Sequence, residues 1–230
     1  MLQLKRQSDI VELLKREKDL TVKELCAALF CSPATIRRDL AELEAQGLVK
    51  RSFGGAVLVE SFFDEQPLTI RGIQNIEEKK HIAARAARLL SGGETVFIDA
   101  SSTTYFLAPY LKDIPDLTVI TNNPHLNIAL SGHRVKNYST GGKMLDSSVA
   151  LVGSEAERFV RGIRADVCFF SARGFADGVV TDSSKGERDI KIAMLEHSAR
   201  RYFLCDTTKI GRTYPYIVAS EDTIDQILSE

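Results

Sequence analysis

Long apolar runs are absent from this sequence, cysteines are few, and each of these absences excludes a class of protein. No stretch approaches the roughly 18 apolar residues that a membrane-spanning helix needs, and the amphipathic start of the chain does not resemble a secretory signal. We therefore expect a cytoplasmic protein that does not contact the membrane. The four cysteines form no C-x-x-C pair, so the sequence predicts buried free thiols and neither a zinc site nor a disulfide framework.

Signals for metal binding and for bulk attraction to polyanions are also lacking. His81, His125, His133 and His197 stand apart without the spacing of metal ligands, so no metal ion and no cofactor is predicted. The formal net charge is −1, and residues 1–60 carry ten Lys and Arg against nine Asp and Glu. Any contact with nucleic acid must therefore come from the placement of basic residues.

The first sixty residues predict three helices with the spacing of a helix-turn-helix. Apolar residues recur at helical spacing over about residues 3–17 and predict a first helix. Thr21 and Glu24 form a capping box at the start of a second helix. Ser32 followed by Pro33 predicts that a third helix starts three or four residues after the second ends, which is the connection of a helix-turn-helix.

Basic residues are placed at the start of the third helix and just after it. Arg37 and Arg38 occupy its first two turns, the part of a recognition helix that faces base edges in the major groove. The segment "LVKRSFGGAVLV" then predicts two short strands joined around two glycines, which together form a wing. Lys50 and Arg51 on its first strand would contact phosphate and fix the register on DNA.

The alternative is a three-helix packing module in which these arginines are solvated or paired with Asp39, Glu42 and Glu44. We favour DNA binding because the cap, the turn length, the arginine placement and the basic wing all agree.

The rest of the chain predicts a larger α/β domain. After an amphipathic helix over residues 76–90, five short apolar runs alternate with helical stretches: TVFID, LTVIT, VKNYS, DVCFF and RYFLC. Such alternation predicts a mostly parallel sheet with helices on its faces. Periodicity lapses over residues 60–75, so we expect a DNA-binding domain of residues 1–59, a linker of residues 60–75 and a domain of residues 76–230.

Polar segments follow all five apolar runs: DASSTT, TNN, TGGK, SARG and DTTK. Because the carboxyl ends of parallel strands share one edge, these segments could form one pocket. Hydroxyls and backbone N–H groups of "ASSTT" suit a phosphate, and Asn122 and Asn123 suit sugar hydroxyls. Gly141 and Gly142 would permit close approach of the backbone, and Lys209 offers a cation. Each motif alone also fits a cap, a turn or a loop, but the five together favour a phosphorylated, hydroxyl-rich ligand.

The stretch "SPATIRRDLAELEAQGLVKRSFGGAV" resembles the winged helix-turn-helix of the DeoR/GlpR family of bacterial transcriptional regulators. Residues 76 to about 220 resemble the C-terminal sensor domain of that family, which is similar in fold to ribose-5-phosphate isomerase. The resemblance implies that the first domain binds operator DNA, with roles for Ser32, Thr35, Arg37 and Arg38. It also implies a phosphorylated sugar or related metabolite as effector. The implied effector contacts are Asp99, Ser101, Ser102, Thr103, Thr104, Thr121, Asn122, Gly141, Gly142, Asp206 and Lys209.

Two positions depart from the pattern of the family. Ser101 and Ser102 occupy the first two places where the family usually has Gly-Thr-Thr, and the loss of the glycine predicts a less close approach to the phosphate. Arg173 in "SARG" stands where the family often has an acidic residue. We include Arg173 among the candidate effector contacts, because it changes the charge at that strand end.

These observations predict a metabolite-responsive regulator, which we expect to be a repressor of sugar or related carbon metabolism and not an enzyme. A homodimer or tetramer is expected, because one small winged helix rarely supplies enough specific contact. The alternative is a sugar-phosphate isomerase-like enzyme with an accessory DNA-binding domain. Asp99 and Asp206 are the candidate bases for such chemistry. The fused DNA-binding domain favours sensing.

Overall fold

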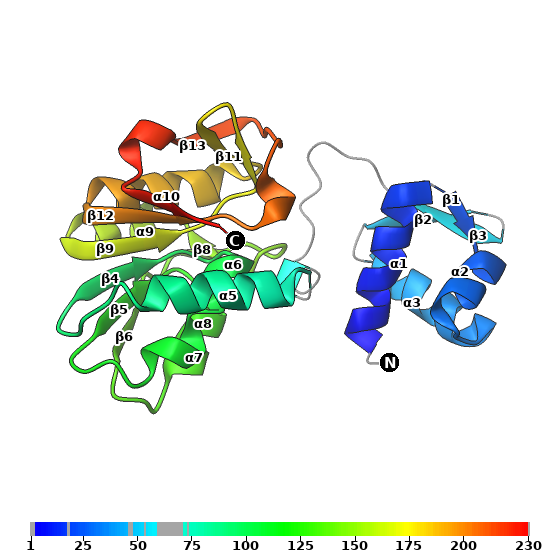
Figure 1. Cartoon of the computed structure of the whole chain (residues 1–230), viewed down its shortest axis with the longest axis horizontal. Helices are drawn as coiled ribbons and strands as arrows, with labels where there is room; N and C mark the ends of the chain where they lie inside the picture. Colours follow the sequence, from blue (N-terminus) through cyan, green and yellow to red (C-terminus); the bar gives the residue numbers. More distant parts are fainter. Residues whose placement is uncertain are drawn as a thin grey trace. The chain divides into compact units, whose positions relative to one another are not determined.

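The computed structural model describes residues 3–17, 19–45, 48–52, 54–58, 71–72 and 74–229. The chain divides into two compact units, Met1–Gln74 and Asn75–Glu230 (Figure 1). Most of the expected linker, residues 60–75, lies outside the described residues, so that linker stays a prediction. None of the helices in the described ranges combines the length and the apolar character that crossing a lipid bilayer requires.

The described part of the first unit contains three helices and a three-stranded antiparallel sheet. The helices are α1 (Gln3–Glu17), α2 (Val22–Leu29) and α3 (Pro33–Ala45). The sheet has the order β1-β3-β2, with β1 (Asp19–Thr21), β2 (Val49–Ser52) and β3 (Gly55–Leu58). The predicted helix-turn-helix and the two wing strands are confirmed. β1 was not predicted, because three residues are too few to show a strand pattern.

Local hydrogen bonds define the starts of α2 and α3. The Thr21 hydroxyl accepts from the Glu24 backbone N–H at 3.2 Å, and the Glu24 carboxylate accepts from the Thr21 backbone N–H at 2.8 Å. This is the predicted capping box. The Ser32 hydroxyl accepts from the Thr35 backbone N–H at 3.3 Å and caps α3. Apolar residues of all three helices and of the wing, including Leu14 and Leu40, form one buried core.

The second unit is built on a six-stranded parallel sheet with the order β14-β12-β9-β4-β5-β6. The strands are β4 (Thr95–Ile98), β5 (Thr118–Thr121), β6 (Lys136–Ser139), β9 (Ala165–Phe170), β12 (Ser198–Leu204) and β14 (Gln226–Leu228). All five predicted runs are strands of this sheet, which confirms the predicted fold class. The chain runs outward from β4 to β6 on one side and from β9 to β14 on the other.

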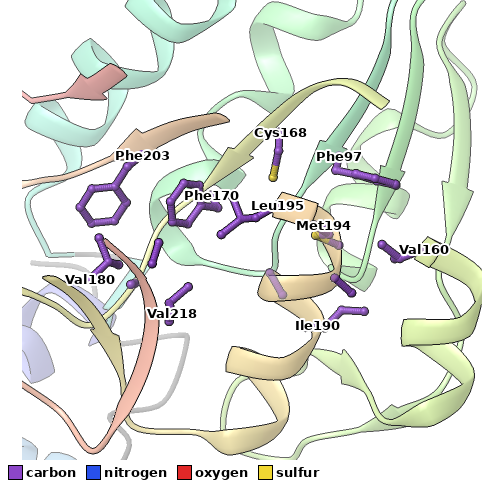
Figure 2. Close-up of a cluster of buried hydrophobic side chains, with 14 of the residues drawn as sticks. Phe97, Val160, Cys168, Phe170, Val180, Ile190, Met194, Leu195, Phe203 and Val218 are labelled. Atoms are coloured by element: carbon purple, nitrogen blue, oxygen red, sulfur yellow. The ribbon is translucent and has the colours of Figure 1, made fainter. Parts of the chain in front are cut away.

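Helices cover both faces of the sheet (Figure 1). One face packs against α5 (Ile76–Ala87), α7 (Ala108–Leu111) and α8 (Pro124–Leu130), through residues such as Val96 and Phe169. The other face packs against α9 (Ser154–Arg161) and α10 (Lys185–Glu196). Figure 2 shows this second core, in which Phe170 of β9 lies near Leu195 and Met194 of α10. Alternate residues along a strand thus pack into opposite cores.

Short elements complete the unit at the carboxyl edge of the sheet and around it. They are α6 (Ser102–Tyr105), the hairpin of β7 (Lys143–Met144) and β8 (Leu151–Val152), and the single-turn helices η1 (Thr207–Lys209) and η2 (Glu221–Thr223). A second antiparallel sheet has the order β10-β11-β13, with β10 (Gly174–Ala176), β11 (Val179–Asp182) and β13 (Tyr216–Ser220). The hairpin, the single-turn helices and the second sheet were not predicted.

Candidate DNA-binding and effector sites

The exposed side of α3 carries Arg37 and Arg38, both of which are exposed. Within the described ranges, neither guanidinium forms an ion pair or a hydrogen bond to another side chain. Ser32 is exposed and Thr35 is half-buried at the start of the same helix. The start of α3 therefore presents two cations and two hydroxyl-bearing residues to its surroundings.

The acidic residues of α3 have other partners. Asp39 is fully buried and bonds to Arg6 of α1, and Glu42 accepts hydrogen bonds from glutamines of α1. Glu44 bonds to Arg51 of the wing. The alternative in which these carboxylates pair with the arginines of α3 is therefore not what the structure contains.

Arg6 was not singled out from the sequence, although it holds α1 against α3. Its Nε lies 2.5 Å from Asp39 Oδ2 and its Nη2 lies 3.0 Å from Asp39 Oδ1. The hydrogen bond to Asp39 raises the pKa of Arg6, so the guanidinium keeps its charge. The two parallel bonds fix both the distance and the angle between the helices.

The two predicted phosphate contacts of the wing, Lys50 and Arg51, differ in whether a carboxylate of the protein already binds them. Lys50 and Arg51 are both exposed on β2. Arg51 donates to Glu44 from its backbone N–H at 2.9 Å and from Nε at 2.5 Å, and the pKa of Glu44 is lowered by these bonds. A phosphate would therefore have to compete with Glu44 for Arg51, whereas in the described part of the chain Lys50 has no such competitor.

The carboxyl ends of the sheet strands lie at one edge, and hydrogen bonds link them. The Thr140 backbone N–H donates to the Thr121 carbonyl at 3.1 Å, which joins the segments after β6 and β5. The Ser171 backbone N–H donates to Asp99 at 3.3 Å, which joins those after β9 and β4. The segments predicted to share one edge are thus brought together.

Asp99 organises the loop after β4. It is fully buried and accepts hydrogen bonds from the hydroxyls of Ser101 and Thr104, both at 2.8 Å. The Ser101 hydroxyl also accepts from the Thr104 backbone N–H and caps α6. These two hydroxyls, predicted as phosphate contacts, are directed into the loop itself, whereas Ser102 and Thr103 face other partners.

A group of five residues next to this loop, which we call the Lys209 cluster, consists of Lys79, Ser102, Thr103, Asp206 and Lys209. All five are buried. Lys79 Nζ donates to the Ser102 hydroxyl at 3.3 Å, and Lys209 Nζ donates to the Thr103 hydroxyl at 3.1 Å and pairs with Asp206. Two ammonium groups thus face one carboxylate.

The charges of the Lys209 cluster are strongly coupled. Burial by itself raises the pKa of Asp206, but Lys209 and then Lys79 outweigh it and lower the pKa to about 2. Asp206 therefore remains ionised at neutral pH. Glu78, which is partly exposed, accepts from the Thr207 backbone N–H at 2.6 Å on the outer side of the cluster.

A second buried group, the Lys191 cluster, consists of Asp99, Asp182, Glu187 and Lys191. Lys191 Nζ lies 2.5 Å from Asp182, 3.4 Å from Glu187 and 3.6 Å from Asp99. Burial by itself lowers the pKa of Lys191, but these carboxylates outweigh it and raise the pKa. Burial also raises the pKa of Asp99. Three carboxyl groups thus surround one ammonium.

Lys79 and Lys191 were missed by sequence reasoning. Each lies on a helix that precedes or flanks the strands, and not in a segment after a strand. Glu187 and Lys191 stand four residues apart on one face of α10, a spacing that indicates a pair but not its burial. Within the described residues, no group of His, Cys, Asp and Glu side chains is arranged to hold a metal ion.

Unsatisfied polar atoms mark the end of β5. Asn122 Nδ2 donates to the Leu151 carbonyl at 3.0 Å, and Asn123 Oδ1 caps α8. Asn122 Oδ1 and Asn123 Nδ2 are buried without a hydrogen-bond partner among the described residues. Buried polar atoms are nearly always bonded, so an acceptor and a donor are available here to a ligand or a water molecule. Thr121, also buried, bonds to the Asn123 backbone N–H at 3.0 Å.

The two predicted glycines differ in what they require. Gly141 and Gly142 both have positive φ, at 66° and 106°. A Cβ at Gly141 would meet open space, whereas one at Gly142 would lie 2.6 Å from the Val152 carbonyl oxygen. Packing against β8 therefore explains Gly142.

Arg173 lies three residues after the end of β9, and its backbone N–H donates to the Thr181 carbonyl of β11. It is half-buried, and its guanidinium lies over the Tyr214 ring at 5.8 Å from the centroid. A separate groove of about 400 Å³ lies between the end of α10 and β13, and none of the predicted site residues lines it.

A winged helix-turn-helix with exposed arginines at the start of its third helix, together with an α/β domain that has buried cations near its strand ends, defines a class of DNA-binding regulators. Residues 6–62 match the model of the DeoR-like helix-turn-helix domain, and residues 74–230 match that of the DeoR C terminal sensor domain. The chain belongs to the DeoR family. The predicted class, a DNA-binding transcriptional regulator with a sensor domain, is thereby confirmed.

Curated relatives cover the whole chain. The chain is 35% identical to the HTH-type transcriptional regulator GolR of Listeria innocua, over 100% of this chain and 91% of that protein. It is 36% identical to the HTH-type transcriptional regulator GlpR of Haloferax volcanii, with the same coverage. It is 33% identical to the lactose phosphotransferase system repressor of Staphylococcus epidermidis, over 90% of this chain and 84% of that protein.

Solved structures resemble the chain in fold. The eIF2B delta of Chaetomium thermophilum has a TM-score of 0.50 at 15% identity, over 68% of this chain and 57% of that one. The ribose 5-phosphate isomerase of Plasmodium falciparum has a TM-score of 0.43 at 12% identity, over 60% of this chain and 53% of that one.

Proposed function

We propose that this protein is a repressor of genes of sugar or related carbon metabolism, and that a phosphorylated sugar or similar metabolite controls its affinity for operator DNA. The observation that carries the proposal is the Lys209 cluster, where two buried ammonium groups lie beside two hydroxyls at the carboxyl edge of the sheet. The name of the relative in Staphylococcus epidermidis, a lactose phosphotransferase system repressor, supports the choice of sugar metabolism.

The DNA-binding role is assigned to α3 and the wing. Arg37 and Arg38 would contact base edges, where an arginine can form two hydrogen bonds with guanine. Ser32 and Thr35 would lie near the DNA at the start of the helix, and Lys50 would contact phosphate. Arg51 would exchange Glu44 for a phosphate. A homodimer or tetramer would place two such heads on paired half-sites.

The effector would be held by the two kinds of polar group at the strand ends. Lys79 and Lys209, with the hydroxyls of Ser102 and Thr103, form the part of the site that suits a phosphate, because ammonium and hydroxyl groups both donate hydrogen bonds to phosphate oxygens. The open acceptor of Asn122 and the open donor of Asn123 suit sugar hydroxyls. Ligand binding can change DNA affinity only if the two states of the protein bind it unequally.

Sensing without turnover is favoured by the state of the two candidate bases. Asp206 is paired with Lys209 and has its pKa lowered to about 2, which makes it a weak base at neutral pH. Asp99 accepts hydrogen bonds from the surrounding loop and is fully buried. Incubation of the purified protein with pentose and hexose phosphates should therefore give no isomerised product; product formation would support the isomerase alternative.

Thermal unfolding of the full chain tests the effector site. Phosphorylated pentoses and hexoses are compared with the same sugars without phosphate, and a ligand at about 100 times its Kd should add roughly 2.7 kcal/mol of stability. We expect at least one phosphorylated sugar to raise the unfolding temperature, and none of the sugars without phosphate to do so. Lys79→Met should abolish that response, because it removes a buried ammonium group. Lys80→Met, at an exposed position of the same helix, is the matched control and should keep it.

A stabilisation that is equal with and without the phosphate, or one that survives Lys79→Met, would contradict the assignment of the Lys209 cluster. Failure of every phosphorylated sugar to stabilise the protein would contradict the choice of ligand.

A further inference from the structure

Two cysteines flank the turn of the helix-turn-helix. Cys26 lies near the end of α2, and Cys31 directly precedes Ser32, the cap of α3. Between them Phe30 adopts the left-handed conformation, with φ 52° and ψ 44°. The chain returns on itself there, and the Cys31 backbone N–H donates to the Cys26 carbonyl at 3.3 Å. A left-handed residue and this hydrogen bond across six residues are the marks of a Schellman helix ending.

The geometry of that ending brings the two cysteines together. Side chains at the two positions joined by this hydrogen bond commonly contact each other. Only the 3.3 Å hydrogen bond and a few covalent bonds separate the two Cα atoms, so their distance is roughly 7 Å at most. Disulfides join cysteines with Cα atoms about 4.4–6.8 Å apart. A bend at the hydrogen bond therefore brings the Cα–Cα distance of the two cysteines into the range of a disulfide.

Both thiols can be reached from solvent. Cys26 and Cys31 are half-buried, which corrects the expectation of buried thiols for these two, and both pack against the same apolar core. Cys168 and Cys205 in the second unit are buried, as predicted. Burial raises the pKa of Cys205 to about 11, which leaves little of the reactive thiolate. The pair in the turn is thus the accessible one among the four.

We propose that Cys26 and Cys31 are a reversible oxidation site, and that a disulfide between them weakens operator binding. The oxidant is a peroxide. One thiolate attacks a peroxide oxygen, which gives a sulfenic acid and water for hydrogen peroxide, and the second thiol then displaces the hydroxyl of the sulfenic acid as water. Two thiols lose two hydrogen atoms in total, and one hydrogen peroxide is reduced to two water molecules. A dithiol reductant reverses the change by thiol–disulfide exchange.

The position of the pair links oxidation to DNA binding. In the reduced protein the Cys31 thiol donates to the Leu29 carbonyl at 3.2 Å. Formation of an S–S bond of about 2.05 Å removes the thiol hydrogen, so this hydrogen bond is lost. The next residue, Ser32, caps α3, so a shift at Cys31 changes the start of the helix that carries Arg37. Hydrogen bonds to base edges weaken steeply when they are misaligned.

Peptide mapping of the full chain gives a direct readout. Trypsin cleaves after Lys23 and Arg37, so a single peptide of residues 24–37 holds both cysteines. After treatment with hydrogen peroxide and alkylation, this peptide should carry no alkyl group and should lack two hydrogen atoms. The peptides of Cys168 and Cys205 should be fully alkylated after denaturation and serve as internal controls. A dithiol should restore alkylation of the peptide of residues 24–37.

Operator binding is measured with a duplex that the reduced protein selects from random-sequence DNA. Oxidation should lower the affinity at least tenfold, and the dithiol should restore it. Cys26→Ser and Cys31→Ser should each bind the duplex when reduced and should each lose the response to peroxide.

Three outcomes would overturn the inference. The first is a peptide of residues 24–37 that stays alkylated twice or is oxidised only to single sulfinic acids. The second is a disulfide that leaves the affinity unchanged. The third is a serine variant that still responds to peroxide. The peptide readout needs no DNA, so failure to select any duplex would count against the proposed function and not against the disulfide.

Discussion

Removal of the buried Arg6–Asp39 ion pair should destabilise the first unit far more than removal of the exposed Arg51–Glu44 pair. The two pairs have the same closest approach, 2.5 Å between a guanidinium Nε and a carboxylate oxygen. They differ in exposure. The side chains of the first pair are 8% and 0% exposed, and those of the second are 50% and 36% exposed. Burial is therefore the variable that the comparison isolates.

Arg6→Met keeps an unbranched apolar chain but removes the guanidinium, and so leaves the Asp39 carboxylate buried without this partner. Breaking a buried pair in this way costs about 3–5 kcal/mol. We expect about 3 kcal/mol, the low end of this range, because a small unit can partly relax around the carboxylate. With a denaturant slope of about 1–1.5 kcal/mol/M for a unit of this size, the urea midpoint should fall by roughly 2–3 M.

The assay is urea unfolding of the full chain. Hydrogen exchange of the backbone amides in α1 and α3 serves as the readout, so that unfolding of the first unit is observed by itself. Arg51→Met is the matched control and should unfold close to the wild-type midpoint, because solvent screens its pair. Arg6→Met combined with Asp39→Leu should recover much of the loss, since no buried charge remains. Equal midpoints for Arg6→Met and Arg51→Met would refute the assignment of the stabilisation to burial.

Three further changes test the remaining sites. Arg37→Ala should weaken binding to a selected duplex by about 1–3 kcal/mol at one salt concentration if it contacts a base, whereas Arg16→Ala, exposed on α1, should not; equal losses would argue against base contact. The pKa of Asp206, about 2 when folded, lies below its unfolded value of about 3.9, so its contribution to stability is present above pH 4 and is lost as the pH falls toward 2. Urea unfolding from pH 5 to 2 should show that Asp206→Asn reduces this loss of stability. An unchanged dependence of stability on pH would speak against the pairing of Asp206 with Lys209. Gly142→Ala should lower the melting temperature more than Gly141→Ala, because only the former places a Cβ against a carbonyl; equal shifts would show that φ alone matters.

Local signals in the sequence were sufficient for the helices of the first unit and for the central strands of the second. Thr21 with Glu24, and Ser32 with Pro33, specify helix starts through bonds within a few residues, so they are visible without the fold. The runs of β4, β5, β9 and β12 are largely buried between the helices of the two faces, and continuous apolar runs of this kind are typical of parallel strands, whereas β6 at the edge of the sheet is mostly exposed.

Elements that depend on distant partners were not predicted. β1 exists because it pairs with β3, and β14 because it pairs with β12. The hairpin of β10 and β11 did carry a signal, because Asp177 and Gly178 between them both have positive φ and Asp-Gly is typical of a tight hairpin turn. That signal was overlooked in a segment considered only for its ligand chemistry.

The sequence predicted where the candidate effector site lies but only some of the residues that form it. Strand order brings the predicted segments to one edge, as expected. Ser101 and Thr104 turned out to bond within the loop, and this depends on the burial of Asp99, which composition does not reveal. Lys79 and Lys191 come from helices, and only the packing of α5 and α10 against the sheet places their ammonium groups among buried carboxylates and hydroxyls.

The order of strands has a consequence for how the sensor unit can be divided. β4, β5 and β6 come from one continuous stretch of chain, β9, β12 and β14 come from a later one, and within the sheet the two halves are joined by the pairing of β4 with β9. A small molecule bound across that junction would contact both halves. Cleavage of the chain at one point between β6 and β9 would separate these halves into two fragments. The two fragments produced by such a cut should therefore reassemble more tightly when the small molecule is present, so that fragment complementation becomes a measure of occupancy.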